Sequence, residues 1–165
     1  MAVGLVCALW PMPVWAQPGG PWEVSALGGI AHGGDLGAGV TDPVVMGTVA
    51  LAVGAGLGLE AGLSWVDRLD WLQPLDVVAA SGGVRYGPVS AGPLTPYAVG
   101  VLSLVRLRPE PPAGAASVQP AFELGGGVEL WLRRRLALRL DSRFVHIDDA
   151  PNFWRTVGGL TIRLR

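Results

Sequence analysis

Few side chains in this sequence could carry out acid–base or metal chemistry. The 165 residues contain two histidines, His32 and His146, and one cysteine, Cys7, which are far apart along the chain. No cluster of histidines or cysteines has the spacing of a metal site. The glycine-rich segments 54–58 and 125–127 do not follow a strand and open a helix, as a phosphate-binding loop would. We therefore predict no metal and no cofactor.

The stretch 143–152, with the sequence RFVHIDDAPN, places a histidine beside two carboxylates. It resembles the His-x-Ser-Asn…Pro-Asn stretch of lipid A 3-O-deacylases, which are eight-stranded outer-membrane barrels. Asp148 stands at the position of the serine nucleophile of such an enzyme, and Ser142 is the nearest serine on the same face. Acyl transfer without an activated hydroxyl lacks its first step. We therefore predict no catalytic residue and keep a deacylase-like enzyme as an alternative.

The composition excludes several classes of protein. The formal net charge is −1, 15% of the residues are charged, 50% are hydrophobic and the mean hydropathy is +0.43. A chain without excess positive charge lacks the electrostatic footprint of a nucleic-acid-binding protein, and its apolar content argues against disorder. The 25 glycines and 14 prolines argue against a mainly helical fold. Such a composition indicates a β-sheet in apolar surroundings.

The beginning of the sequence has the features of a secretory signal peptide. Residues 2–10 form an uncharged apolar run, and Val14 and Ala16 stand at the −3 and −1 positions of a cleavage site before Gln17. We expect a signal peptide over 1–16 and one β-barrel domain over 17–165. Cleavage would remove Cys7 and leave a domain without thiols.

In the rest of the chain, apolar side chains alternate with small or polar ones, and turn-rich stretches interrupt the alternation. Leu59 and Leu63 share one face of such a segment, for example, while Glu60 and Ser64 share the other. We predict eight β-strands, at residues 22–30, 45–53, 57–66, 77–86, 97–107, 120–132, 136–146 and 153–164. The fold class is therefore all-β, an eight-stranded antiparallel up-and-down barrel.

The connections between these strands differ in length from one end of the barrel to the other. Polar or proline-rich connections are expected at one end, over 31–44, 67–76, 108–119 and 147–152. The turns at 55–56, 87–96 and 133–135 are expected at the other end, with both termini. Long outer loops and short periplasmic turns are typical of outer-membrane barrels.

Alternation does not decide which face of the barrel is apolar. A soluble lipocalin-like barrel turns its apolar face inward and needs a charged exterior, whereas a transmembrane barrel turns it toward lipid. The polar faces here hold mostly glycine, alanine, serine and threonine, which suit a narrow lumen better than a solvent surface. We therefore predict a transmembrane barrel and keep the soluble periplasmic binding barrel as an alternative.

Charged residues on the polar faces would then pair with one another inside the lumen, because buried charges need partners. The predicted lumen charges, with a structural role, are Glu23, Glu60, Arg85, Glu123, Glu129, Arg139, Asp141, Arg143, Arg155 and Arg163. Eight strands leave a lumen just wide enough for side chains. We therefore expect no wide pore.

Strand length and aromatic residues agree with a membrane barrel. The predicted strands have about the 9–11 tilted residues that cross a hydrocarbon core, or slightly more. Aromatic residues near strand ends resemble interfacial girdles; they are Trp22, Trp65, Trp71, Tyr86, Tyr97, Trp131, Phe144, Phe153 and Trp154. The uncharged run 43–59 could instead form a short membrane helix, but such a helix does not explain the last three strands.

Four segments in the second half carry a family resemblance. They are 96–100 (PYAVG), 122–129 (FELGGGVE), 135–144 (RLALRLDSRF) and 158–164 (GGLTIRL). In these segments the chain resembles the small outer-membrane β-barrels of Gram-negative bacteria, the group that includes OmpA-like and OmpX-like barrels. Over 22–90 the resemblance is one of pattern.

The resemblance implies a location in the outer membrane of a Gram-negative bacterium. It also implies a monomer whose partners are outer-membrane lipid and the outer-membrane assembly machinery. Such barrels usually end in an aromatic residue that resembles a signal for that machinery, whereas residues 162–165 here read IRLR. We expect a structural or surface-interaction role and no enzymatic activity.

Overall fold

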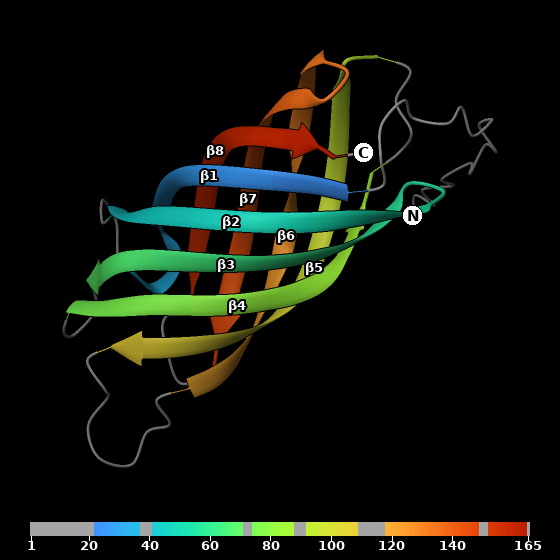
Figure 1. Cartoon of the computed structure of the whole chain (residues 1–165). Helices are drawn as coiled ribbons and strands as arrows, with labels where there is room; N and C mark the ends of the chain where they lie inside the picture. Colours follow the sequence, from blue (N-terminus) through green and yellow to red (C-terminus); the bar gives the residue numbers. More distant parts are fainter. Residues whose placement is uncertain are drawn as a thin grey trace, which may run out of the picture.

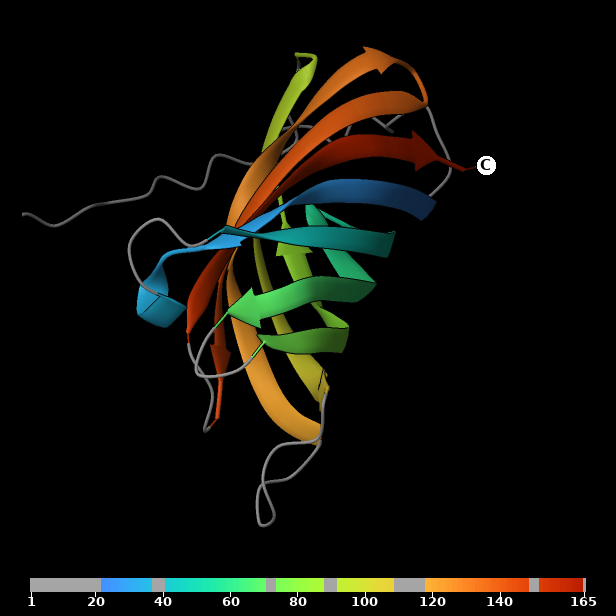
Figure 2. The same cartoon turned by 90° about the vertical axis from the view of Figure 1, so that its left-hand side faces the viewer.

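The structure is a computed structural model that describes residues 22–36, 41–70, 74–87, 92–108, 118–148 and 152–164. Within these ranges the chain forms a closed barrel of antiparallel β-strands (Figure 1; Figure 2). The expected signal peptide, 1–16, lies outside the described residues. Its presence therefore stays a prediction.

The barrel contains all eight predicted strands. They are β1 (Trp22–His32), β2 (Thr41–Gly54), β3 (Leu57–Asp70), β4 (Pro74–Tyr86), β5 (Leu94–Arg108), β6 (Val118–Arg133), β7 (Leu136–Ile147) and β8 (Phe153–Arg163), and a short 3-10 helix, η1 (Gly34–Leu36), follows β1. Each strand pairs with the next along the chain, and β1 pairs with β8 to close the barrel. The predicted eight-stranded antiparallel up-and-down barrel is confirmed.

The two ends of the barrel differ in their connections. One end is here called the turn end. Two-residue turns there join β2 to β3 at 55–56 and β6 to β7 at 134–135, and β8 ends there as well. Residues 87–93 join β4 to β5 at the same end. The opposite end, the loop end, has the connections that follow β1, β3, β5 and β7, and those after β1 and β5 are the longest of the barrel. All four loop-end connections are shorter than expected, and the first two differ most, because β2 begins at Thr41, β3 continues to Asp70 and β4 begins at Pro74. The backbone ladder continues through polar residues such as Asp42, which pairs with Ala31, because its hydrogen bonds do not depend on side-chain polarity.

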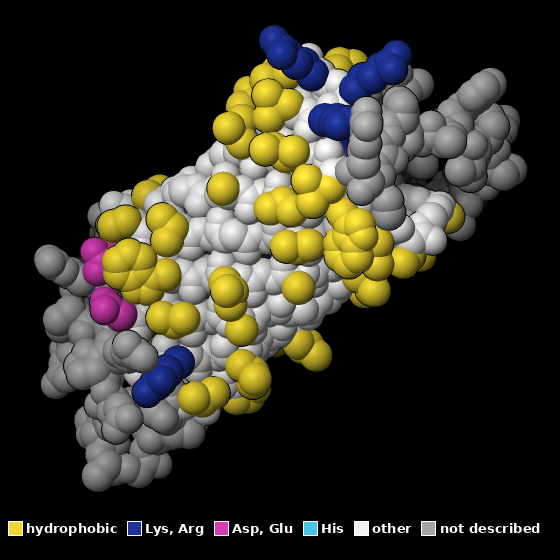
Figure 3. Space-filling model, viewed as in Figure 1, with side chains coloured by type: hydrophobic (Ala, Val, Ile, Leu, Met, Phe, Trp, Pro, Cys, Tyr) yellow, Lys and Arg dark blue, Asp and Glu magenta, His cyan; other side chains and the backbone are white. Residues whose placement is uncertain are grey.

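Burial is the reverse of that in a soluble barrel. Leu63 on β3 and Leu102 on β5 point outward and are 66% and 74% exposed, whereas Asp141 and Arg143 on β7 point inward and are fully buried at 0%. Hydrophobic side chains are spread over the outer wall, and the charged side chains visible there lie at the two ends (Figure 3). The wall therefore presents an apolar belt to its surroundings.

Glycine is required where the backbone turns sharply or packs closely. Ala55 and Gly56 form the β2–β3 turn with φ values of 50° and 80°, the left-handed region typical of tight hairpins. A Cβ atom on Gly127 of β6 would lie 2.0 Å from the carbonyl oxygen of Leu140 and 2.5 Å from the hydroxyl of Tyr97. Gly127 therefore lets β6 bend closely around the Tyr97 ring.

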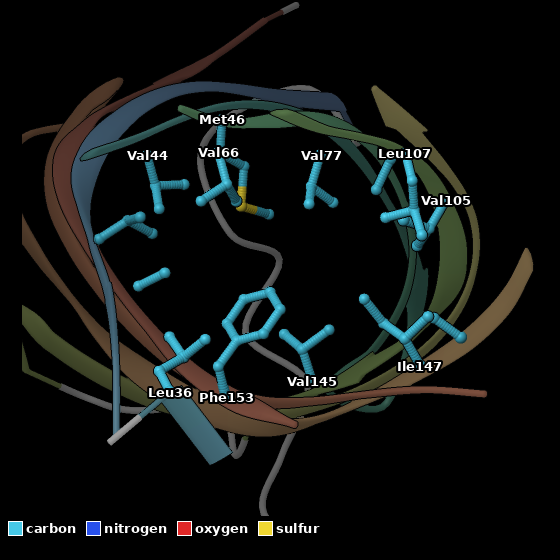
Figure 4. Packing of buried hydrophobic residues seen from close by; sticks show 14 of the residues in the cluster. Leu36, Val44, Met46, Val66, Val77, Val105, Leu107, Val145, Ile147 and Phe153 are labelled. Carbon is cyan, nitrogen blue, oxygen red and sulfur yellow. The ribbon is translucent and has the colours of Figure 1, made fainter. Parts of the chain in front are cut away.

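The lumen near the loop end is apolar, which the sequence interpretation did not anticipate. Figure 4 shows side chains from several strands pointing toward one another across the barrel, with Phe153 of β8 among them. The buried cluster comprises Leu27, Ala31, Leu36, Val44, Met46, Val66, Val77, Ala79, Val105, Leu107, Ala121, Val145, Ile147, Phe153 and Val157. The ion-paired charges of the lumen lie in its middle and at its turn end, and Asp42 is a further buried carboxylate near the loop end.

Residues 43–59 belong to β2, the Ala55–56 turn and β3, so the competing interpretation of this run as a helix is wrong. Among the described residues, no helix is both long and apolar enough to cross a membrane.

Candidate functional site

Ten charged side chains inside the barrel form ion pairs in two groups, and the side chain of Tyr97 joins these groups into one network. Five carboxylates and five guanidinium groups take part: Glu23, Glu60, Glu123, Glu129 and Asp141 with Arg85, Arg139, Arg143, Arg155 and Arg163. They project from β1, β3, β4, β6, β7 and β8 because each occupies an inward position of the alternation. The structure thus brings all the predicted lumen charges together, with formal charges that cancel.

The centre of the network lies on β7 and β3. Nε of Arg143 donates to Oδ1 of Asp141 at 2.7 Å, and Nη2 of Arg139 donates to Oδ2 of Asp141 at 2.8 Å. Glu60 accepts from both guanidinium groups, at 2.6 Å from Arg143 and 2.8 Å from Arg139. Each of these two carboxylates therefore joins two arginines, which the planar, multi-donor guanidinium group favours.

A second cluster lies at the turn end. The guanidinium of Arg85 donates to Glu129 at 2.9 Å and to Glu23 at 2.6 Å. Arg163 donates to Glu23 at 2.7 Å, and its guanidinium lies 3.9 Å from the centroid of the Trp131 ring. Because Glu23 is on β1 and Arg163 on β8, this pair crosses the seam where the first and last strands meet.

The third cluster borders the apolar part of the lumen. Arg155 donates to Glu123 at 2.5 Å and to the hydroxyl of Ser64 at 2.9 Å. Glu123 also accepts from the hydroxyl of Ser103 at 2.9 Å and lies 3.5 Å from Arg143. The contact with Arg143 connects this cluster to the central one.

Tyr97 belongs to the network, although the sequence suggested a membrane girdle for it. The ring lies inside the barrel with 6% exposure, and its hydroxyl contacts both Asp141 and Arg139. Phe153 and Trp131, also expected in a girdle, lie on inward positions as well. The alternation contained the missing signal, since Tyr97 shares a face with Ser103, whereas Leu102 and Leu104 lie on the other face.

These contacts leave little room for water in the lumen. The side chains of Arg139, Arg143 and Asp141 have no accessible surface, and at the loop end Phe153 is 1% exposed. A continuous water column would make such side chains accessible. In the part of the chain that the structure describes, side chains therefore fill the barrel interior.

A row of polar side chains lies on the outer wall near the loop end. Nε2 of His32 on β1 lies 3.0 Å from the hydroxyl of Thr156 on β8. The Thr156 hydroxyl is in turn 3.0 Å from that of Ser142 on β7. Hydroxyl groups facing an apolar medium need such partners.

Among the residues that the structure describes, His146 has no hydroxyl group as a hydrogen-bond partner. Its ring hydrogen-bonds the side chain of Asn152, lies 3.6 Å from Asp148 and stacks against Phe122 with ring centroids 4.9 Å apart. Ser142 is four residues earlier on the same strand, which corresponds to about 13 Å. His146 and Ser142 therefore cannot form a nucleophile–base pair in this arrangement.

Asn152 also connects η1 to the residues directly before β8. Its backbone N–H and its side-chain amide donate to Oδ2 of Asp35, at 2.9 Å and 2.8 Å. The N–H of Asp35 donates to the carbonyl of Asn152 at 2.8 Å. These bonds fix η1 beside β8, so that Leu36 reaches the apolar cluster. Among the described residues, no group of three or more His, Cys, Asp or Glu side chains could hold a metal ion.

Comparisons with known proteins agree with this geometry. No protein-family profile and no curated protein sequence matches the chain. Among solved structures it is similar to Neisserial surface protein A (NspA), with a TM-score of 0.72, 14% identity, and coverage of 87% of this chain and 97% of that one. The chain has the fold of small eight-stranded outer-membrane β-barrels.

Two further structures show the same fold at low sequence identity. The N-terminal β-barrel domain of Pseudomonas aeruginosa OprF gives a TM-score of 0.61 with 10% identity, over 87% of this chain and 98% of that one. The outer-membrane enzyme PagL gives 0.54 with 9% identity, over 86% and 99%. The shared fold thus includes proteins of different function, and specific function must come from the residues of this chain.

Proposed function

We propose that this chain is an integral barrel of the Gram-negative outer membrane with a structural or surface-interaction role. The observation that carries the proposal is the reversed burial, with large apolar side chains outside and paired charges inside. An apolar belt around a whole barrel would be costly in water, where monomeric proteins rarely expose large apolar patches. In lipid the same belt is favourable, and the closed sheet satisfies every backbone group internally.

The same observation argues against the soluble lipocalin-like alternative. A soluble binding barrel would place leucines such as Leu63 and Leu102 inside and would need a charged outer wall. Both side chains are instead more than half exposed. The apolar cluster near the loop end is small compared with the outer belt and is capped by Leu36.

The packed lumen supports a role without a wide pore. Ion pairs fill the middle and turn end, and mainly apolar side chains fill the loop end. The longer connections at the loop end would then face the outside of the cell, as in outer-membrane barrels generally. Surface contact through this end is the role we propose for a monomer embedded in outer-membrane lipid.

Cell fractionation tests the location. We expect the protein to fractionate with outer membranes and to migrate faster on gels when unheated, because a folded barrel resists detergent. A soluble periplasmic fraction without heat-dependent mobility would contradict the proposal. Planar bilayers test the filled lumen, since reconstituted protein should give no large, stable conductance steps.

A lipid A-modifying enzyme is a second candidate, and one contact favours it. The 3.0 Å separation of His32 and Thr156 places an imidazole beside a hydroxyl on the outer wall, which is the first element of a nucleophile–base pair. Mass spectrometry of lipid A from a deletion strain tests this candidate. An unchanged acyl pattern would eliminate it, whereas a change that Thr156→Val reproduces would support it.

A further inference from the structure

We propose that the β6–β7 turn is a binding site for anionic phospholipid headgroups of the periplasmic leaflet. The inference rests on the outer-membrane location proposed above, which places the turn end on the periplasmic side. The turn consists of Arg134 and Arg135 and follows Arg133, the last residue of β6, and all three arginines are exposed. Figure 3 shows arginine side chains gathered at this end of the barrel, whereas the opposite end shows acidic side chains together with arginine.

The positive charge of the turn is not neutralised within the described barrel. Arginines inside the lumen, such as Arg85 and Arg163, pair with carboxylates. None of the three turn arginines makes an ion pair with a described residue. Three adjacent like charges repel one another, so an external anion at this site would be stabilising.

Turn geometry does not explain the arginines. Two-residue hairpin turns favour glycine, asparagine or aspartate, and the β2–β3 turn of this barrel follows that preference with Gly56. Neither Arg134 nor Arg135 has a positive φ. The N–H of Arg163 donates to the carbonyl of Arg135 at 2.9 Å, so the backbone of the turn is held while the side chains remain exposed.

The position of the turn favours lipid phosphate as the ligand. Leu132, directly before the arginines, is 53% exposed on the outer wall. Leu164, which directly follows the end of β8, is 45% exposed. The arginines thus follow immediately after the apolar belt, where the headgroup phosphates of a surrounding leaflet lie. A guanidinium group can bind phosphate through two parallel hydrogen bonds.

The test uses the full chain reconstituted in vesicles of equal phosphatidylcholine and phosphatidylglycerol. The protein is extracted in mild detergent, and the lipids that remain bound are identified by mass spectrometry. We expect the wild type to retain phosphatidylglycerol preferentially and the R133Q/R134Q/R135Q variant to lose that preference. Each arginine should contribute up to roughly fivefold, and added salt should weaken the enrichment because exposed charges are screened.

Two matched variants separate charge from fold. R133K/R134K/R135K keeps the charge and should retain part of the enrichment, whereas R106Q removes an exposed arginine near the loop end and should retain most of it. Heat-dependent gel mobility checks that each variant is folded. Equal enrichment in the wild type and the triple glutamine variant would overturn the inference, and so would an equal loss in R106Q.

Two other outcomes are informative. Binding to purified peptidoglycan that depends on the three arginines, without phospholipid enrichment, would overturn the inference and assign the turn to the cell wall. A wild-type chain that inserts into vesicles without enriching phosphatidylglycerol overturns this inference alone. A wild-type chain that does not insert contradicts the outer-membrane location as well.

Discussion

The hydroxyl of Tyr97 on β5 donates a 2.7 Å hydrogen bond to Oδ2 of Asp141 on β7, with β6 between the two strands. The same hydroxyl accepts a 2.8 Å hydrogen bond from Nε of Arg139. The guanidinium groups of Arg85 and Arg139 each lie 4.9 Å from the centroid of the ring. Tyr97 therefore connects the ion pairs of the turn end to those of the centre.

Replacing Tyr97 by phenylalanine should destabilise the barrel. The variant leaves a buried carboxylate without one donor and a buried guanidinium without one acceptor, which costs about 1–3 kcal/mol. Urea titration in vesicles, followed by heat-dependent gel mobility, measures the free energy of unfolding. Tyr86→Phe is the control, because Tyr86 is 45% exposed on the outer wall and should change stability little.

Glu60→Gln should be more costly, because the carboxylate neutralises Arg139 and Arg143 together. Breaking a buried ion pair by removing one partner costs about 3–5 kcal/mol. The same urea titration measures this effect. The single variant Arg143→Gln and the double variant with Glu60→Gln complete a double-mutant cycle. We expect a coupling energy of about 0.5–3 kcal/mol, whereas strictly additive effects would show that the two side chains do not interact.

The two faces of β7 should respond differently to polar substitution. Leu138→Arg places a charge in the apolar belt and should cost about 2–4 kcal/mol if the site is near the middle of the bilayer. Ala137, the neighbouring residue, is fully buried inside, and Ala137→Ser should be tolerated. Equal tolerance of both variants in vesicle refolding would contradict the assignment of the faces.

Gly127→Ala should impair folding, because its new Cβ would lie 2.0 Å from the carbonyl oxygen of Leu140. Overpacking of this kind costs about 1–3 kcal/mol. Gly82→Ala is the matched control, since a Cβ there meets nothing within 4 Å. Refolding yields in vesicles should fall for the first variant only, and a fall in both would point to a general effect of losing glycine.

The number of strands and the inward or outward direction of most side chains were predictable, because alternation is a local property of the sequence. Leu59 and Glu60 occupy opposite faces wherever the strand ends. Strand ends were less predictable, since the ladder continues where side chains are no longer apolar, as in the pairs of His32 with Thr41 and of Asp70 with Pro74. The expected loops over 31–44 and 67–76 were therefore too long.

Individual partners in the lumen could not be predicted. Arg139 reaches Glu60 across the barrel, 79 positions apart in the sequence, and only the tilt and stagger of the closed sheet bring them together. The apolar end of the lumen was missed for a related reason. Val44 and Val45 are adjacent apolar residues on opposite faces, so their types do not indicate which one points inward.

The Glu23–Arg163 pair also favours the correct register between β1 and β8, the two strands that close the barrel. If β8 slid by two residues along β1, every side chain would keep its inside or outside position, so hydrophobicity alone would not oppose the slip. When the slide brings Thr161 opposite Glu23, the carboxylate loses Arg163, with which it now pairs in register. The buried charge pair thus distinguishes the correct closure from a slipped closure that the apolar belt accepts equally well.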